Sequence, residues 1–185
     1  ACSTGTEAII EGYRQIQSGR ARRMLCGGTE GSSHYQWAGF DAMRVLSRKY
    51  NDEPERASRP LSASAAGFVP SSGSGILLLE NLEDAESRGA RIYGEILGGN
   101  VNCGGHRRGG SMTAPNPDGV QMCIKRAVEE SGIENGEIDA INGHLTATGA
   151  DSSEVFNWAK ALEVSPEEFP LITSTKSMIG HALGA

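Results

Sequence analysis

The sequence is poor in aromatic residues and has no long apolar run. Only 5% of its 185 residues are aromatic, and the longest uninterrupted run of large apolar side chains, at residues 76–79, has the length of one strand. A helix that spans a bilayer needs about 20 mainly apolar residues. We therefore expect a chain that does not insert into a membrane and whose hydrophobic residues form a globular core.

Basic charge is also in short supply, because 17 lysines and arginines face 23 acidic residues and the net charge is -6. A nucleic-acid-binding surface needs a track of basic side chains that neutralises phosphates. No part of the sequence collects enough of them, so the charge balance argues against a nucleic-acid partner.

The cysteines are few and far apart. Cys2, Cys26, Cys103 and Cys123 form no Cys-x-x-Cys pair. This spacing excludes both a cysteine zinc site and the disulfide framework of a small secreted domain. The histidines show no helical metal-binding spacing either, so we expect no metal site and a reducing, cytoplasmic setting.

The first residues contain no initiator methionine and no charged region followed by an apolar one. A secretory signal peptide would show that pattern. We interpret the sequence as an internal piece of a longer protein.

Helical spacing and short apolar runs alternate along the chain, which predicts a layered α/β fold. Residues 32–60 are polar and broken by Gly39 and Pro54, so we expect an irregular segment with one or two helical turns. Residues 98–119 are rich in glycine and predict a long surface loop. Helices are expected at residues 4–18, 80–88, 120–132 and 151–162, with another beginning at 177–182, and strands at residues 22–26, 76–79, 91–97, 138–142 and 171–174.

Cys2 directly precedes the first expected helix. A thiol there meets unpaired backbone N–H groups and the positive end of the helix dipole, and both favour the thiolate. This is the setting of a nucleophile, whereas the plainer interpretation is a small buried hydrophobic residue.

Two histidines follow expected strands at equivalent positions. His144 comes just after one strand, and His181 comes after the next strand, with Lys176 five residues before it. Open α/β sheets bind their ligands at the carboxyl ends of strands. Together with Cys2, these residues favour an enzyme that forms a covalent intermediate.

Two other functions explain these residues less well. The glycine- and serine-rich run at residues 72–75 precedes a strand, whereas a phosphate-binding loop follows a strand and opens a helix. A Cys-His hydrolase would use Cys2 and one histidine, and would leave Lys176 and the second histidine without a role.

Several short motifs occur in a characteristic order. They are ACSTG at 1–5, MRVLS at 43–47, ASRP at 57–60, GFV at 67–69, MTAP at 112–115, NGHLTAT at 142–148 and TKSMIGH at 175–181. In these motifs, and over essentially its whole length, the sequence resembles the elongating β-ketoacyl-acyl carrier protein synthases of the thiolase superfamily. The resemblance implies a thiolase-like layered α-β-α-β-α fold, incomplete at both ends. Residues 1–90 would be the remainder of the N-terminal half and residues 91–185 the first part of the C-terminal half.

The resemblance also implies an activity in fatty acid biosynthesis. In that family the cysteine takes an acyl chain from acyl carrier protein, and malonyl-acyl carrier protein then decarboxylates to a carbanion that attacks the thioester. The implied partners are acyl carrier protein and a second copy of the full-length chain. No cofactor is implied, because the carrier protein brings the phosphopantetheine arm.

Catalytic roles transfer by position in the motifs. Cys2 matches the nucleophile, and His144 and His181 match the pair that holds the malonyl thioester carbonyl and stabilises the enolate. Lys176 matches the lysine that orders the site, and Glu154 falls where the acid of its network is expected. The Asp-Ser-Ser-Glu pattern that ends at Glu154 independently predicts a capping box.

Binding roles transfer in the same way. Thr146 and Thr148 match residues that bond the phosphopantetheine arm, and Thr113 is a further substrate-binding candidate. Arg44 and Arg48, which by themselves suggest a solvated helix face, are the implied contacts to the carrier protein.

The sequence departs from the family in two places. Leu145 stands where a glycine usually follows the first histidine, and we expect it to narrow the tunnel of the arm. Ala65 and Ala66 replace an Arg-Asp pair, which removes an expected structural ion pair. The family's opening strands and its later Gly-Phe segment are absent from the sequence, so we expect residues 1–185 alone to have little activity.

Related functions stay open at this point. A polyketide or aryl-polyene ketosynthase would use the same mechanism. A non-catalytic partner subunit of the chain-length-factor type characteristically lacks the nucleophilic cysteine, which Cys2 supplies here.

Overall fold

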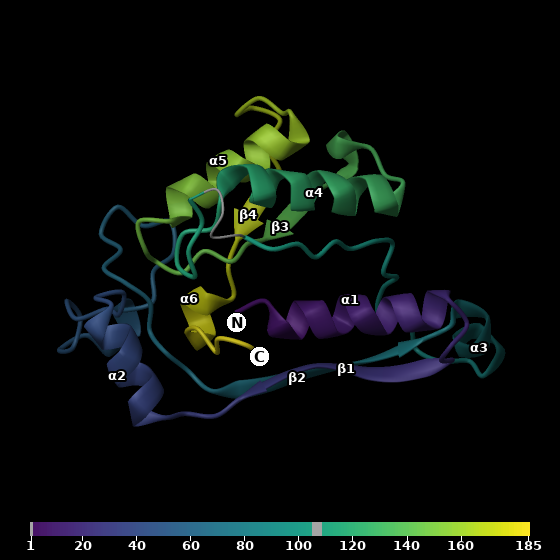
Figure 1. Ribbon diagram of the computed structural model, residues 1–185, viewed down its shortest axis with the longest axis horizontal. Coiled ribbons are helices and arrows are strands. Elements are labelled where there is room, and N and C mark those ends of the chain that lie inside the picture. The colour runs from purple at the N-terminus through teal and green to yellow at the C-terminus, as the bar shows by residue number, and fades with distance from the viewer. Residues whose placement is uncertain (1, 105–108) are drawn as a thin grey trace.

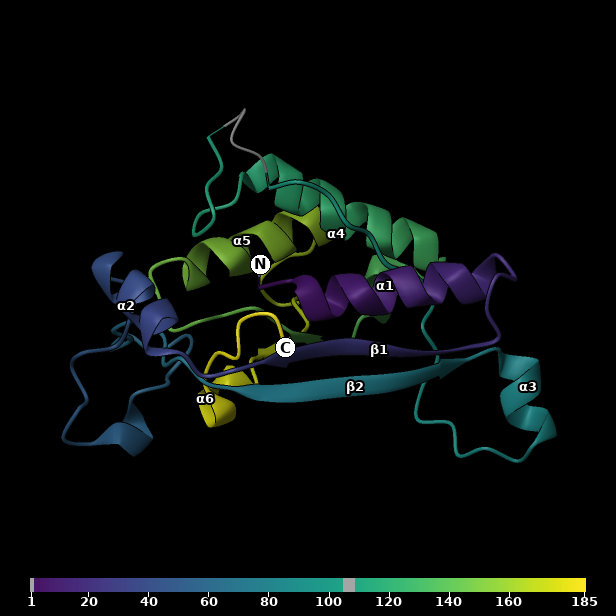
Figure 2. The ribbon, with the colours of Figure 1, turned by 60° about the horizontal axis from the view of Figure 1, so that its bottom comes forward.

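The computed structural model describes residues 2–104 and 109–185 (Figure 1). Ala1 of the ACSTG motif and residues 105–108 of the expected glycine-rich loop lie outside the described residues. Helices and strands alternate along the described chain and stack in layers, which confirms the α/β prediction (Figures 1 and 2). In this part of the chain, no helix is both long enough and apolar enough to cross a membrane.

The lower two layers in Figure 1 are α1 (Thr4–Gln17) and a two-stranded antiparallel sheet of β1 (Arg23–Glu30) and β2 (Gly73–Glu80). α1 lies on the face of this sheet that carries Cys26, and the absence of a side chain at Gly12 allows the close contact. A Cβ at position 12 would lie 2.1 Å from Cys26 Sγ. Gly12 is therefore required for the close packing of α1 on the sheet.

The opposite face of the same sheet is apolar and uncovered. Side chains alternate between the two faces of a strand, so Leu25, Ile76 and Leu78 point away from α1. These three side chains are between 55% and 74% exposed. Among the described residues, α1 is the helix that covers this sheet, and it does so on one face only (Figure 2).

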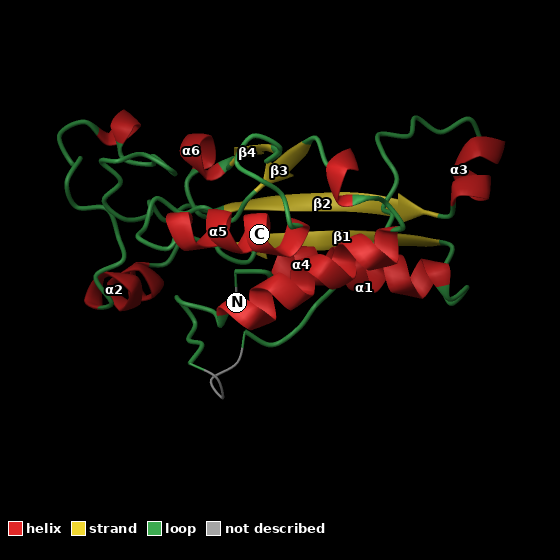
Figure 3. Cartoon of the chain, turned by 90° about the horizontal axis from the view of Figure 1, so that it is seen from above, coloured by secondary structure: helices red, strands yellow, loops and turns green. Residues whose placement is uncertain are grey.

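The upper two layers consist of a β-α-β unit and a second helix. β3 (Ala140–Asn142) and β4 (Leu171–Thr173) pair in parallel, and α5 (Asp151–Leu162) connects them. α4 (Pro117–Ser131) packs beside α5, and α4 lies over α1 when seen from above (Figure 3). The core between these elements contains Ile124, Ile141, Ala161 and Leu162.

The segment between the two strands of the lower sheet is more regular than expected. It contains the nine-residue helix α2 (His34–Ala42) and a short 3-10 turn, η1 (Pro54–Arg56). No residue of α2 is buried. The expectation that Arg44 and Arg48 share a helix face is wrong, because α2 ends before them and Arg44 has a φ of 59°.

Three shorter elements complete the described chain. They are α3 (Leu82–Ser87), the 3-10 turn η3 (Asn135–Glu137) and α6 (Lys176–Ile179). The helix expected from residue 177 to 182 stops earlier, because Gly180 takes a φ of 72°, which a right-handed helix cannot contain.

The strand expected at residues 91–97 is wrong. This segment pairs with no strand in the described chain, and Tyr93 is 86% exposed. Its far end is held by side chains of α1, since Tyr13 Oη donates to the Leu97 carbonyl and Arg14 donates to the Gly99 carbonyl. Alternation of apolar and polar residues predicts a strand only where a backbone partner exists.

Candidate active site

The structure brings Cys2, His144 and His181 together, as the sequence predicted. A ligand atom from each side chain, the Cys2 Sγ and one ring nitrogen per histidine, lies within 4.8 Å of the others. The two imidazole rings meet edge to face, with centroids 5.1 Å apart. Cys2 lies just before α1, and the histidines follow β3 and β4, so three separate segments converge at one point.

Glycines hold the segment of His181 against the start of α1. A Cβ at Gly5 would lie 3.1 Å from the Gly184 carbonyl oxygen, and a Cβ at Gly28 would lie 2.3 Å from the same atom. Only residues without side chains allow this approach of α1, β1 and the segment that follows His181. Gly5 and Gly28 therefore help to place His181 beside the Cys2 thiol.

Backbone hydrogen bonds fix His181 on its other side. His181 N donates to the Val69 carbonyl at 2.8 Å, and Ser71 N donates to the His181 carbonyl at 3.0 Å. The Phe68 ring packs edge to face on the imidazole, with centroids 5.1 Å apart. The GFV motif at residues 67–69 thus packs against and supports the His181 ring.

The His181 ring is a neutral hydrogen-bond donor. It is only 3% exposed, and burial, with smaller contributions from His144 and Lys176, lowers its pKa to about 3. Leu183 N donates to Nδ1 at 3.3 Å. Because Nδ1 accepts this bond, we assign the proton of the neutral ring to Nε2. A metal ion at Nε2 would need the lone pair that this tautomer lacks there, so the arrangement suits donation to an oxygen better than metal binding.

His144 is held through its backbone. Its N–H donates to Glu154 Oε1 at 2.6 Å, and Leu145 N donates to Glu154 Oε2 at 2.8 Å. His144 is exposed, yet partial burial of the ring and the charge of Lys176 both lower its pKa, to about 4, against the opposing effect of Asp151. Since the two main causes act in the same direction, the neutral imidazole is the favoured form.

Asp151 organises the loop that follows His144. Its buried carboxylate, 5% exposed, accepts N–H groups from Thr146, Ala147, Thr148 and Leu61 at 2.9 to 3.4 Å. Ala147 and Leu61 adopt left-handed φ values of 61° and 59°. Such backbone is costly for residues other than glycine, and the bonds to one buried carboxylate stabilise it.

The expected capping box at Asp151–Glu154 is wrong. α5 begins at Asp151 with Ala150 as its N-cap, and no side chain caps it. Asp151 and Glu154 turn instead toward the preceding loop, whose N–H groups point at them. The same residue spacing serves either purpose, and only the path of residues 143–148 decides between them.

The charged residues of the site are perturbed by burial. Burial lowers the pKa of Lys176, against the nearby charges of Glu154 and Cys2. Burial raises the pKa of Glu154, against the hydrogen bonds from Leu145 and His144. The Lys176 carbonyl also accepts the Ser58 hydroxyl of the ASRP motif, which joins α6 to the segment after α2.

Cys2 lies where the sequence predicted, but its thiol is not shifted toward the thiolate as expected. α1 begins at Thr4, two residues after Cys2. Burial raises the pKa of the Cys2 thiol, and the charge of Lys176 only opposes this effect. Removal of a thiolate from water outweighs the attraction of nearby positive charge, so the resting thiol is neutral.

The binding candidates divide into two groups. The Thr146 and Thr148 hydroxyls lie 3.1 Å apart in the loop after His144. Thr113 is exposed in the segment before α4. Arg44 and Arg48 are exposed beyond α2, and Arg48 forms an ion pair with Asp41 at 2.6 Å.

Two supporting residues were missed at the level of sequence. Asp151 was interpreted as part of a helix cap, and Phe68 was one letter of a motif without a stated role. The left-handed residues that need Asp151 carry no sequence signal, because they are alanine and leucine. The GFV motif beside the histidine motifs is the signal that could have indicated Phe68.

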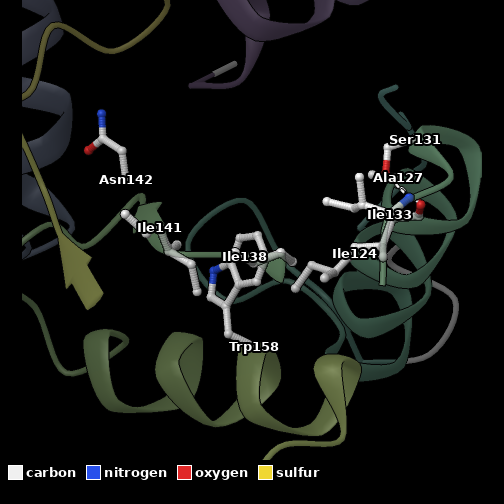
Figure 4. Close-up of a pocket in the computed structure, with 10 residues that line it drawn as sticks. Ile124, Ala127, Ser131, Ile133, Ile138, Ile141, Asn142 and Trp158 are labelled. Carbon is white, nitrogen blue, oxygen red and sulfur yellow. Dashed lines mark hydrogen bonds between the residues drawn. The ribbon is translucent and has the colours of Figure 1, made fainter. Parts of the chain in front are cut away.

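An apolar hollow of about 280 Å³ lies elsewhere, between α4, β3 and α5 (Figure 4). Its lining includes Ile138, Ile141 and Trp158, while Asn142 is at one end. Cys2, His144 and His181 do not line it. It lacks the thiol and imidazole groups of the candidate site and extends the apolar core described above.

Comparison with known proteins agrees with this geometry. The family model described as "Beta-ketoacyl synthase, N-terminal domain" matches residues 1–85, and "Beta-ketoacyl synthase, C-terminal domain" matches residues 93–185. The chain is 44% identical to 3-oxoacyl-[acyl-carrier-protein] synthase II, chloroplastic, from Arabidopsis thaliana over 189 residues. That alignment covers the whole chain and 34% of the relative.

Solved structures give the same result. The whole chain superimposes on 43% of a β-ketoacyl synthase from Burkholderia phymatum STM815, with a TM-score of 0.90 and 34% identity. It also superimposes on 45% of a type II polyketide ketosynthase in complex with its acyl-carrier protein, with a TM-score of 0.88 and 30% identity. The chain spans less than half the length of these proteins. Its fold is part of the thiolase-like layered fold that they share, and the chain belongs to the β-ketoacyl synthase family.

Proposed function

We propose that this chain carries the condensing site of a β-ketoacyl-acyl carrier protein synthase of fatty acid biosynthesis. The observation that supports this function best is the cluster of Cys2, His144 and His181, in which one thiol and two neutral imidazoles lie within 4.8 Å. A thiol that forms a thioester and two neutral donors for a developing oxyanion are the groups that a decarboxylative condensation needs.

The first half-reaction is acyl transfer. Cys2 Sγ attacks the thioester carbonyl of an acyl-carrier protein, a new sulfur–carbon bond forms, and the bond to the carrier's sulfur breaks. The proton of the neutral Cys2 thiol leaves during the attack and ends on the departing carrier thiol. Cys2 then holds the acyl chain as a thioester.

The second half-reaction is decarboxylation followed by carbon–carbon bond formation. The malonyl carboxylate leaves as carbon dioxide, and its bonding electrons move into an enolate whose oxygen accepts hydrogen bonds from the two imidazoles. The enolate carbon attacks the acyl carbonyl on Cys2, the sulfur–carbon bond breaks, and the expelled Cys2 thiolate takes a proton from water. A positively charged histidine would be a stronger acid but would protonate the enolate, so the lowered pKa values suit this step.

The surrounding residues have supporting roles in this proposal. Lys176 and Glu154 order the site, Thr146 and Thr148 bond the phosphopantetheine arm, and Thr113 is a further substrate-binding residue. The exposed Arg44 and Arg48 offer positive charge to acyl carrier protein, which is the bound partner in the solved complex of the type II polyketide ketosynthase. No cofactor bound to the chain takes part in these steps.

The same proposal includes the setting of the chain. Residues 1–90 belong to one thiolase-like half and residues 91–185 to the other, which the matches at 1–85 and 93–185 support. The whole protein would act as a homodimer. The four cysteines are free thiols, which fits a reducing cytoplasm.

A polyketide ketosynthase is the second candidate. The solved type II polyketide ketosynthase, at 30% identity, supports it, and Cys2 distinguishes the chain from a subunit without a nucleophile. The chemistry at the site is identical in both cases, and the two candidates differ in the carrier protein and acyl chain that they accept.

The test uses the full reading frame that encodes this chain. Incubation with acyl-acyl carrier protein should add one acyl group, detected by intact mass, and Cys2→Ala should abolish it while Cys103→Ala should not. Malonyl-acyl carrier protein should then release carbon dioxide and give the extended product. Acylation at another cysteine, or release of free fatty acid without an extended product, would overturn the proposal in favour of a hydrolase.

A further inference from the structure

Gly143 precedes His144. A side chain at this position would clash with its neighbours, whereas the backbone conformation alone would allow one. Gly143 is absent from the glycines with left-handed φ. A Cβ at this position would lie 2.9 Å from Leu145 Cγ, 3.1 Å from Leu145 Cδ1 and 3.0 Å from Glu154 Oε1. The volume that a side chain at position 143 would need is already occupied, mainly by Leu145.

Leu145 cannot move away to make room. Its side chain has no exposed surface, and its backbone is bonded on both sides. Leu145 N donates to Glu154 Oε2 at 2.8 Å, and its carbonyl accepts the Ser174 hydroxyl at 3.0 Å. The expected narrowing of the arm's tunnel by Leu145 does not follow, because a fully buried side chain lines no open channel in the described structure.

One of the atoms that crowd Gly143 also holds His144. Glu154 Oε1 is the acceptor of the His144 N–H, at 2.6 Å. A side chain at position 143 would therefore push against both Leu145 and the acceptor of the His144 backbone. Gly143 itself continues the hydrogen bonding of the strands, since its N–H donates to the Thr173 carbonyl at 2.8 Å.

We propose that Leu145 is a positioning residue for His144, and that Gly143 and Leu145 form a reciprocal pair in which the large residue at 145 requires the small residue at 143. The catalytic part of this inference rests on the proposed function of His144. The pair holds the backbone of His144 against Glu154, and misplacement of a catalytic group by about 1 Å can lower the rate by about 100-fold.

The reciprocal pair makes a specific prediction for three variants. Gly143→Ala should lower kcat for malonyl decarboxylation by roughly tenfold or more, with little change in KM and with normal acylation of Cys2. Leu145→Ala alone should lower it by only a few fold. Adding Leu145→Ala to Gly143→Ala should restore most of the lost kcat, because it removes Leu145 Cγ and Cδ1 and leaves only the contact with Glu154.

Gly149→Ala is the matched control. Gly149 lies on the same loop, and a Cβ there would meet no atom within 4 Å. Its kcat should stay within about twofold of the parent value. Thermal unfolding of every variant reports packing independently of catalysis.

The outcomes separate this inference from the proposed function. If Gly143→Ala keeps full kcat, or if the double variant loses as much as the product of the single losses, the reciprocal pair is overturned. If Gly143→Ala does not fold, recovery of cooperative unfolding in the double variant supports the pair, and its failure to recover overturns it. An inactive parent protein would contradict the proposed function, while the thermal unfolding of the three variants would still test the pair.

Discussion

The two segments that carry the histidines place similar rings at the same point by different means. The segment after β3 holds His144 through carboxylates, because Glu154 and Asp151 accept backbone N–H groups from residues 144–148. The segment after β4 holds His181 through backbone pairing with residues 69–71 and through the bond from Leu183 N to Nδ1.

This difference has a physical consequence. Hydrogen bonds between backbone groups do not depend on pH. Hydrogen bonds from several N–H groups to a carboxylate are strong only while the carboxylate is ionised. The His144 segment therefore depends on two side chains from the first turn of α5, and the His181 segment depends mainly on the path of the chain. Substitutions should damage the first segment more readily than the second.

The largest expected effect is at the rings themselves, where the two segments should behave alike. His144→Ala and His181→Ala in the full-length protein should each lower condensation by about 100-fold or more while Cys2 still accepts an acyl chain. Carbon dioxide release and intact mass measure the two half-reactions. His34→Ala, at an exposed position on α2, is the control. Loss of the acyl-enzyme in both variants would instead indicate a Cys-His base mechanism.

The next effect should distinguish the segments. Asp151→Asn replaces one acceptor oxygen by an NH₂ group that faces backbone donors, so we expect a loss of about 3 kcal/mol in the free energy of unfolding. Asp118→Asn, an exposed aspartate in the first turn of α4, should change it by less than about 0.5 kcal/mol. Urea unfolding measures both values. An equal effect of the two substitutions would show that the N–H groups around Asp151 find other partners.

A smaller effect concerns pH. His181 has its pKa lowered from 6.5 to about 3, so below pH 6.5 the unfolded chain binds a proton that the folded chain does not. The free energy of unfolding should therefore fall as the pH falls from 7 toward 4, by up to about 1.4 kcal/mol per pH unit from this residue. His181→Gln should reduce that slope. The same slope in parent and variant would contradict the assignment of a neutral, buried ring.

The smallest effect is expected at the hydroxyls of the carboxylate-held loop. Thr148→Val removes a hydroxyl that lies 3.1 Å from Thr146 Oγ1 and accepts the Ala150 N–H. We expect KM for malonyl-acyl carrier protein to rise about three- to tenfold with kcat nearly unchanged. Thr175→Val, at the exposed N-cap of α6 in the other segment, is the matched control. A fall in kcat without a change in KM would show that Thr148 positions His144 and not the substrate arm.

Sequence patterns located the catalytic candidates more accurately than their environment. The positions of Cys2 before a helix and of two histidines after parallel strands were predicted, because local spacing determines which residues lie at the ends of elements. The ionisation of Cys2 was predicted in the wrong direction. Local reasoning counts the helix end but not the burial of the thiol in the folded chain.

Other errors have the same origin. Alternation at residues 91–97 indicated a strand, but a strand exists only where another backbone accepts its hydrogen bonds, and here α1 supplies side chains instead. The pattern from Asp151 to Glu154 indicated a helix cap, but the N–H groups nearest to both carboxylates in space belong to the preceding loop. In each case the hydrogen-bond partners come from a part of the chain that the local pattern does not indicate.

The sequence by itself determined most of the order of helices and strands, the placement of the thiol and the imidazoles at their ends, and the family, because these depend on short-range spacing and on motifs. Only the tertiary structure decided the protonation states of Cys2, His144 and His181, the role of Asp151 and the packing of Leu145 over Gly143. Burial and hydrogen-bond partners depend on segments that meet in space, and no single stretch of sequence contains them.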